Sequence, residues 1–427
     1  MKKFLIELDR FYVRKRRCKQ KKNTEKNSSY SEYDAIRNEV LKYFQRIIPR
    51  IKTKEYNKKQ ELNLTVSEDF SVFSNPEFVL GSLGELTQLG LLKKIVSICI
   101  DQEKMSSHDL TSEVLIAQAA LALRAEKSKK NKSLRFRGVF PENEDFSKLI
   151  KGIGIIDQVK SIRCLNKNVD KINVFKAKGK IERGDSIQSG DRKLSAQENF
   201  IIHMNDSLEM INKKLTERAE NKLIEIIGEL IGNAEDHSEC DEAHWQFYGF
   251  TDENTKGEIF QQISIFNFGT SIADSIRASK SKSIVKKRVE PYINNHEGDV
   301  DSDVLHTIAA LQENVSSKLD EQPDRGQGFT DLLLFFEDVA NECANDPENH
   351  VQMSIISGSV TMYFDGTYLP TVNEDGRHLI FFNDKNCPEQ QPDSDFVKKM
   401  NDITFPGTII TIKYRLREED YELEEVL

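Results

Sequence analysis

Glu229, Asn233 and His237 are spaced four residues apart in a segment whose apolar residues follow a helical period. Side chains four positions apart lie on the same side of a helix, so we expect these three groups to form one polar row. The amide oxygen of Asn233 suits Mg²⁺, because this hard cation prefers oxygen ligands. Glu229, one turn earlier, is placed to orient or deprotonate a water molecule. The row predicts a magnesium-dependent site with a carboxylate base.

A second group of residues points to phosphate binding. Arg325, Gly326, Gln327 and Gly328 directly precede a very apolar helical pattern at Leu332–Ala340. Backbone N–H groups at the start of a helix, together with its positive end, hold phosphate oxygens. The alternative interpretation of the two glycines is a simple turn that starts the helix.

Four short motifs occur in an order that resembles the GHKL superfamily of ATP-binding domains, which includes gyrase B, the histidine kinases and the MutL-type proteins. They are Glu229 with Asn233, Asn267 with Gly269, Gly326 with Gly328, and Gly407 with Thr408. The resemblance covers about residues 195–417. It implies ATP and Mg²⁺ as cofactors, Asn233 as the metal ligand and Glu229 as the general base. The cofactor-binding residues that it implies are Asn233, His237, Asn267, Gly269, Arg325, Gly326, Gln327, Gly328 and Thr408.

The sequence departs from the family at the second motif. Asn267 stands where the family has an aspartate that accepts a hydrogen bond from the adenine amino group, and Ser271 replaces the second glycine. The amide oxygen of Asn267 can accept the same hydrogen bond, so adenine binding is still expected.

The expected activity is ATP hydrolysis, with the polar stretch 280–325 as a lid that orders over the phosphates and switches a partner interaction. The alternatives are an anti-sigma-like serine protein kinase and an ATP sensor that does not hydrolyse. His203 has no two-helix phosphoacceptor hairpin around it, which argues against a histidine kinase. His237, Cys240 and His244 do not form a zinc site by this interpretation, since a closed zinc site takes four ligands.

The elements that must position these residues follow from their periodicities. We expect one long helix over Ile201–Ile231, a hairpin formed by Trp245–Phe250 and Ile259–Phe266, and a helix that begins near Ile272. The later elements are helices at Val304–Val315 and Leu332–Ala340 and strands at Val351–Phe364, His378–Phe382 and Ile409–Tyr414.

The front half alternates strands and helices between residues 61 and 165. Strands are expected near Leu62–Val66, at the end of Leu91–Ile100 and at Leu134–Phe140, with an amphipathic helix over Leu110–Leu123 and a further helix from Phe146. The order of these elements around Asn75, Asp101 and Phe136–Pro141 resembles a STAS-type domain, the module of anti-sigma antagonists. Residues of roughly 30–60 are expected to be helical up to Pro49.

The fold class expected is therefore α/β, in the wider sense α+β. It comprises a C-terminal α/β sandwich of the GHKL type, with a mixed sheet covered by helices, and a smaller STAS-like domain. The predicted division is a basic arm and helix at 1–60, the STAS-like domain at 61–165, a linker at 166–200 with one strand near Ile172–Phe175, the ATP-binding domain at 201–417 and an acidic tail at 418–427.

Composition limits the remaining possibilities. The chain has 427 residues, a net charge of −9 and 38% hydrophobic residues, and no run of eighteen apolar residues, which excludes a membrane-spanning helix. Six cysteines without paired spacing indicate reduced thiols and a cytoplasmic location. A protein partner or a homodimer is expected, in bacterial signalling or defence. Nucleic acid could bind the basic residues 1–22, but the acidic balance disfavours it.

Overall fold

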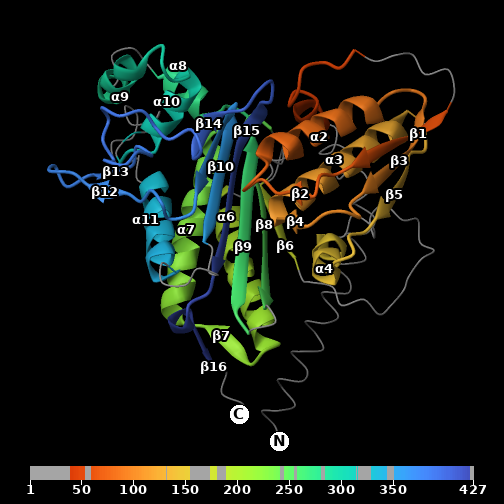
Figure 1. Cartoon of the computed structure of the whole chain (residues 1–427). Coiled ribbons are helices and arrows are strands. Elements are labelled where there is room, and N and C mark those ends of the chain that lie inside the picture. The colour runs from red at the N-terminus through yellow and green to blue at the C-terminus, as the bar shows by residue number, and fades with distance from the viewer. Residues whose placement is uncertain are drawn as a thin grey trace, which may run out of the picture.

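The computed structural model describes residues 39–52, 59–130, 132–153, 174–179, 189–240, 245–253, 257–279, 284–313, 315, 328–343 and 351–423. They form two lobes in contact (Figure 1). The N-terminal lobe covers one face of a large sheet, and a layer of helices covers the other face. In the described part of the chain, none of the helices has the length and apolarity needed to span a bilayer.

The N-terminal lobe is built on a three-stranded parallel sheet of order β1-β3-β5. The predicted alternation of strands and helices is confirmed here. The elements are β1 (Gln60–Thr65), β2 (Asp69–Phe70), α2 (Pro76–Gly90), β3 (Ile95–Asp101), β4 (Ser107–His108), α3 (Leu110–Lys129), β5 (Arg135–Val139) and α4 (Glu144–Ile153), with β2 and β4 as a short parallel pair.

The helix α3 is the central helix of the molecule and is buried on almost every side, so the amphipathic pattern expected for Leu110–Leu123 is wrong. The reason is its position between α2, α4 and strands of the large sheet. At its first turn the Thr111 hydroxyl donates a hydrogen bond to the Ser264 hydroxyl of the large sheet, 2.8 Å away. Alanines such as Ala119 and Ala122 permit this close packing, since they have little bulk.

The C-terminal lobe contains a seven-stranded sheet of order β14-β11-β10-β15-β9-β8-β6. Every neighbouring pair in it is antiparallel, so the expectation of a mixed sheet is wrong. Its strands are β6 (Phe175–Gly179), β8 (Trp245–Glu253), β9 (Ile259–Phe268), β10 (Gln352–Gly358), β11 (Val360–Phe364), β14 (Val397–Lys399) and β15 (Phe405–Arg415). The predicted hairpin corresponds to β8 and β9.

The helices of this lobe are α6 (Ser189–Glu209), α7 (Glu217–Asp236), α8 (Ile272–Ala278), α9 (Ile284–His296), α10 (Ser302–Ala310) and α11 (Gly328–Cys343). Two small antiparallel pairs complete it, β7 (Lys213–Leu215) with β16 (Tyr421–Leu423) and β12 (Thr371–Val372) with β13 (His378–Leu379). A 3-10 turn, η1 (Glu418–Asp420), precedes β16.

Alternate residues of β9 face the two layers, as strand geometry requires. Ile263 and Ile265 pack with the helices α6, α7 and α11, whereas Phe266 and Phe268 pack with the N-terminal lobe. On the second face Phe268 contacts the rings of Tyr43 and Phe44, at centroid distances of 5.1 and 5.5 Å.

The single helix expected over Ile201–Ile231 is two helices. The helix α6 ends at Glu209, Asn212 adopts a positive φ of 57°, and β7 precedes α7. Pairing of β7 with β16 holds the chain in an extended form at this point. Thr216 then begins α7 as its N-cap, because its hydroxyl accepts a hydrogen bond from the N–H of Ala219.

Three other sequence expectations also differ from the structure. The strand expected near Ile172–Phe175 is present as β6, slightly later in the chain and as an edge strand of the large sheet, and the linker expected at 166–200 also contains the first half of α6. The acidic tail expected from 418 contains η1 and β16, where Asp420 forms an ion pair with Arg417. In the region 30–60 the described helical residues are 39–44, and residues 1–38 lie outside the described part.

The polar stretch 280–300 contains a helix that was not expected, α9, whereas α10 corresponds to the helix expected at Val304–Val315. The helices α9 and α10 bury Val285, Val289 and Tyr292 of the first and Val304 and Ile308 of the second in the core of the C-terminal lobe. The part of the expected lid that is described is therefore packed helix, because a few apolar residues among many lysines suffice to anchor it.

Candidate functional site

The predicted row of polar residues lies on α7 and at its C-terminal end. The helix buries a stripe of six apolar residues against the sheet: Leu223, Ile226, Ile227, Leu230, Ile231 and Ala234. Glu229 is exposed and Asn233 is half-buried, both outside this stripe. His237 is the C-cap residue and is half-buried. The structure therefore keeps Glu229 and Asn233 one turn apart, as predicted, and puts His237 just past the last turn.

Gly232 of α7, next to Asn233, faces another helix. A Cβ at Gly232 would lie 2.9 Å from Nζ of Lys193, and one at Gly228 would lie 2.5 Å from Nε2 of Gln197. Both contacts come from α6, which packs along α7. Both atoms are the ends of flexible side chains, so the contacts show that α6 lies close along α7 at these glycines.

The carboxylate of Glu229, on α7, lies near Asp331 in the first turn of α11. Burial raises the pKa of Asp331, and the negative charges of Glu229, Glu225 and Glu313 raise it further. Gly328, the last residue of the predicted phosphate loop, is the first residue of the same helix. The predicted base and the start of α11 therefore lie on the same side of the molecule. Arg325, Gly326 and Gln327 lie outside the described residues.

The end of β9 joins the end of α7 at Gly269. Gly269 bridges to Ser238, and the N–H of Thr270 donates to the carbonyl of His237 at 3.2 Å. A Cβ at Gly269 would lie 2.3 Å from that carbonyl oxygen, so only glycine permits this approach. The second motif of the sequence is thus in direct contact with the end of the first.

The start of β15 joins the same place from the other side. In the sheet register Thr408 lies opposite Asn267 and Gly407 lies opposite Phe268. Gly407 has a φ of 142°, and a Cβ there would lie 2.1 Å from the carbonyl oxygen of Asn267. The Thr408 and Ser357 hydroxyls are 2.8 Å apart. Three of the four predicted motifs therefore meet where α7, β9 and β15 come together.

Asn267 has a side chain on the helix-covered face of the sheet, the face shared with Ile263 and Ile265. It is 2% exposed, and its Nδ2 has no hydrogen-bond partner among the described residues. A buried amide donor without a partner costs about 1–3 kcal/mol, so such groups need a reason. This is the single unsatisfied polar atom among the predicted site residues that the structure describes.

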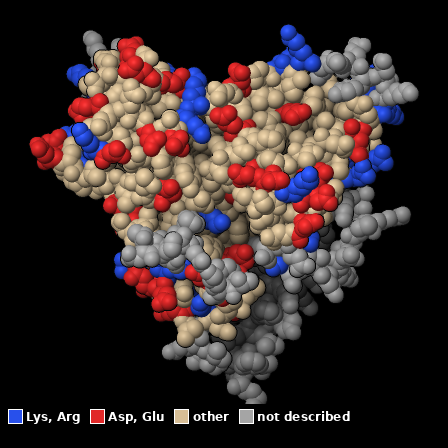
Figure 2. Space-filling model, viewed as in Figure 1, with Lys and Arg blue, Asp and Glu red and all other residues tan. Residues whose placement is uncertain are grey.

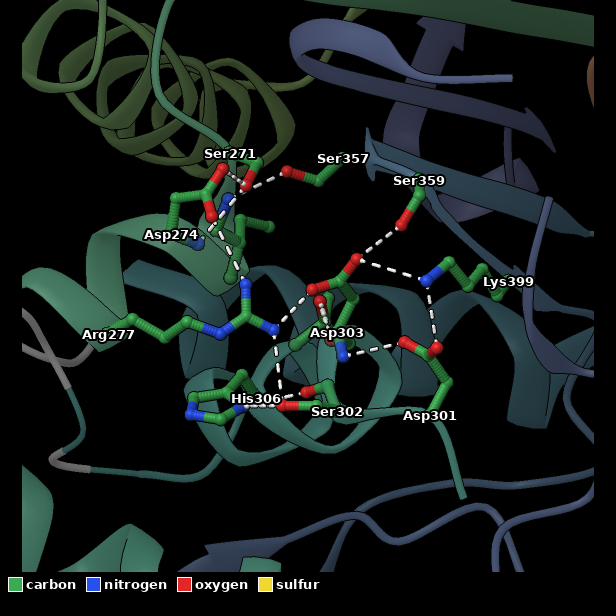
Figure 3. Close-up of polar contacts among 12 residues, drawn as sticks. Ser271, Asp274, Arg277, Asp301, Ser302, Asp303, His306, Ser357, Ser359 and Lys399 are labelled. Carbon is green, nitrogen blue, oxygen red and sulfur yellow. Dashed lines mark hydrogen bonds and ion pairs between the residues drawn. The ribbon is translucent and has the colours of Figure 1, made fainter. Parts of the chain in front are cut away.

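Behind this junction lies a polar network that the sequence analysis missed (Figure 3). Ser271 caps α8: its hydroxyl accepts from the N–H of Asp274 at 3.1 Å. Arg277 then bonds Asp274 and Asp303, and Lys399 lies 2.8 Å from Asp301. Although burial opposes it, hydrogen bonds from Ser359 and Arg277 lower the pKa of Asp303. The network ties α8 to α10 and β14.

These residues carried no signal in the sequence, because their partners are distant along the chain. Arg277 and Asp303 are separated by 26 positions, and Lys399 and Asp301 by 98. His237 is connected to the same part of the molecule, since its Nδ1 lies 3.3 Å from the Ser275 hydroxyl of α8.

The donor set is compatible with a magnesium ion held mainly by a ligand's phosphates. The described residues contain no group of three or more His, Cys, Asp or Glu side chains able to hold a metal on their own. Asn233 supplies one oxygen, and Mg²⁺ in nucleotide sites takes one or two protein oxygens together with phosphate and water. For the rejected zinc interpretation, Cys240 is buried and His244 lies outside the described residues.

No protein-family model, curated protein or solved structure matches this chain.

Proposed function

We propose that this protein binds ATP with Mg²⁺ at the junction of α7, β9 and β15 and hydrolyses it. The observation that carries the proposal is the meeting of Asn267, Gly269 and Thr408 with the end of α7 at one place. These segments lie up to about 170 positions apart in the sequence, and their order resembles that of the motifs of the GHKL superfamily. A shared location is what a common ligand requires.

In this proposal Asn267 recognises the base. Its amide oxygen accepts from the exocyclic amine of adenine, while its Nδ2, which has no partner among the described residues, donates to the neighbouring ring nitrogen. The Thr408 hydroxyl, opposite Asn267 in the sheet, contributes a second polar group on the same side. An aspartate could accept from the amine but could not donate to the ring nitrogen, so the proposed pairing favours an amide at this position.

Asn233 and Glu229 act at the phosphate end. Asn233 holds the metal through its amide oxygen, and Mg²⁺ when bound neutralises phosphate charge. Glu229, one turn away and exposed, positions the attacking water and accepts its proton. The N–H groups at the start of α11 face phosphate oxygens.

The output of the site is proposed to be a change in binding to a protein partner or a second copy of the chain. The segment between α8 and α11 contains the region 280–325, expected to act as a lid, and the network of Arg277, Asp303 and Lys399 joins its helices to the sheet. A ligand at the junction would affect the position of α8, because Ser271 and His237 there contact Asp274 and Ser275 of this helix.

The test uses the purified full-length chain. ATP binding is measured by calorimetry with and without Mg²⁺, and turnover by incubation with γ-labelled ATP. Free labelled phosphate supports hydrolysis, label on protein would indicate a kinase, and binding without either would indicate a sensor. Absence of ATP binding at millimolar concentration in the presence of Mg²⁺ would refute the proposal.

A matched pair of variants separates the role of Glu229 from a general charge effect. Glu229→Gln should lower kcat by about 10²–10⁴-fold with ATP affinity within a few-fold of the parent, since it removes the base and keeps the shape. Glu225→Gln, one turn earlier, exposed and also close to Asp331, should leave kcat within about twofold. Equal losses in both variants would contradict the assignment.

A further inference from the structure

A cavity of about 460 Å³ lies between the two lobes, on the face of the sheet opposite α7. One wall is the N-terminal lobe, with Ser74 and Pro76 at the start of α2 and His108 at the end of β4. The other wall is the sheet, with Tyr363 of β11, Lys398 of β14 and Lys413 of β15 among its residues. Figure 2 shows a furrow between the N-terminal lobe and the part of the C-terminal lobe that contains α8, α9, α10 and β14, with basic side chains along its wall.

His108 is an unsatisfied group in this cavity. Both of its ring nitrogens are buried, and neither has a hydrogen-bond partner among the described residues. Its ring packs against Phe146 with a centroid distance of 4.1 Å, which holds the ring in place without satisfying a nitrogen. Burial and the nearby charge of Lys413 lower the pKa of His108 to about 4. An imidazole held in this way is available to donate to a ligand.

Lys413 brings an ammonium group to the same cavity. It projects from the face of β15 that packs on the N-terminal lobe, and its ammonium group forms no hydrogen bond or ion pair with the described residues. Burial lowers its pKa, and the charges of Asp109 and Asp252 oppose this without forming an ion pair. A half-buried cation with no counter-ion is costly, so an anion at this place would offset the cost.

The start of α2 adds a third set of groups that can bind an anion. The helix has 15 residues, and its N-cap residue, Asn75, makes no side-chain hydrogen bond to the first turn. The N–H groups of that turn therefore lack a capping side chain, and Ser74 and Pro76 place them beside the cavity. Asp395 is the one acidic residue among the described residues that line the cavity, against two basic residues, Lys398 and Lys413.

The remaining lining is suited to a flat ring. Phe73, Tyr363 and Phe396 contribute aromatic side chains, and the rings of Tyr363 and Phe396 are stacked at 6.3 Å. The Tyr363 hydroxyl accepts from Nε2 of Gln352 at 2.9 Å, which fixes its ring. The volume falls in the range of small-ligand pockets, about 300–1,000 Å³. The cavity thus combines several hydrogen-bond donors suited to a phosphate group with an aromatic wall.

We infer that this cavity binds a small organic phosphate of nucleoside monophosphate size, with the phosphate between His108, Lys413 and the start of α2. Such a ligand contacts both lobes at once, and so stabilises their packing. This site is separate from the proposed ATP site, because the two lie on opposite faces of the sheet. The ligand is therefore an effector and not a substrate of the hydrolysis.

The probe is uridine monophosphate, whose base cannot form the adenine pairing proposed for Asn267. Calorimetry with the full chain should show binding in the micromolar to low millimolar range. Uridine, which lacks the phosphate, should bind at least tenfold more weakly, and inorganic phosphate should compete. Absence of binding by both uridine monophosphate and inorganic phosphate would overturn the inference.

Lys413→Met is the decisive variant, because it separates a loss of ligand binding from a loss of stability. It should weaken the binding of uridine monophosphate at least tenfold, while the melting temperature of the ligand-free protein should not fall, since a buried unpaired charge is replaced by an apolar chain of similar length. Undiminished binding in this variant would refute the site. His108→Asn should weaken binding in the same way.

Two neighbouring lysines give the matched control. Lys398 lines the cavity, whereas Lys399 is paired with Asp301 and is not part of the lining. Lys398→Met should weaken binding and Lys399→Met should not, with both variants checked for folding by their melting temperatures. Asn233→Ala should leave the binding of uridine monophosphate unchanged, and Lys413→Met should leave ATP binding unchanged. Failure of either proposal is thereby distinguished from failure of the other.

Discussion

Glu113, in the central helix α3, is a carboxyl group with no exposed surface. Its Oε1 accepts a hydrogen bond from Nε2 of Gln102 at 2.8 Å, and its Oε2 has no partner among the described residues. Its pKa is raised from 4.5 to about 8, mainly by burial; the hydrogen bond from Gln102 lowers it and the nearby charge of Asp109 raises it by smaller amounts. The folded protein therefore holds a proton on Glu113 that the unfolded chain releases.

The sign and size of the effect on stability follow from linkage. Below pH 4.5 Glu113 is protonated in both the folded and the unfolded state and costs no stability. As the pH rises from 4.5 toward about 8, the unfolded chain releases the proton and the free energy of unfolding falls. Each pH unit in that window costs about 1.4 kcal/mol, so the folded state loses about 3 kcal/mol by pH 7. Glutamine has the shape of the protonated acid and cannot ionise. Glu113→Gln should therefore raise the free energy of unfolding by about 3 kcal/mol at pH 7 and by less than about 1 kcal/mol at pH 5.

The assay is urea unfolding followed by circular dichroism at pH 5, 6, 7 and 8, on the parent and the variant. The difference between the two proteins should widen with pH, since all other titrating groups are common to both. Glu126→Gln, on the same helix but partly exposed in an ion pair with Lys130, is the control and should change stability by less than about 1 kcal/mol. A constant difference across the pH range, or a less stable Glu113→Gln variant at pH 7, would refute the reasoning.

Three further predictions concern the junction of α7, β9 and β15 and the polar network beside it. Gly407→Ala should destabilise the protein by about 2–4 kcal/mol, seen as a lower melting temperature, because its Cβ would meet the Asn267 carbonyl at 2.1 Å; Gly138→Ala, with its nearest contact at 3.8 Å, should cost far less. Asn267→Ala should weaken ATP binding about tenfold or more, and Asn267→Asp should weaken it less, since a carboxylate accepts from the adenine amine but cannot donate to the ring nitrogen; calorimetry measures both. Arg277→Met should cost about 1 kcal/mol in urea unfolding, since its pairs with Asp274 and Asp303 are partly exposed.

Local patterns predicted most of the regular elements well. The strands β1, β3, β5, β8 and β9 and the start of α8 lie where alternation and turn residues indicated. These elements are decided by residues close in sequence, so a local pattern contains the needed information. The same holds for the spacing of Glu229 and Asn233, which any α-helix converts into a shared side.

The errors occurred where distant segments intervene. The break between α6 and α7 depends on β16, more than 200 residues away, which pairs with β7. A strand was expected near β6, but as part of a polar linker, and only its pairing with β8 makes it part of the large sheet. Burial of α3 on nearly all sides depends on contact with the large sheet, as at Thr111 and Ser264.

The sequence by itself determined which side chains could do chemistry and in what order they occur: a carboxylate and an amide one turn apart, then glycines before later elements. It also determined the helical or extended character of most segments, since that depends on neighbours a few positions away. Only the tertiary structure decided that Asn267, Gly269 and Thr408 meet the end of α7. It alone brought His108 and Lys413 into one cavity, because sheet register and lobe packing join residues that are about 300 positions apart.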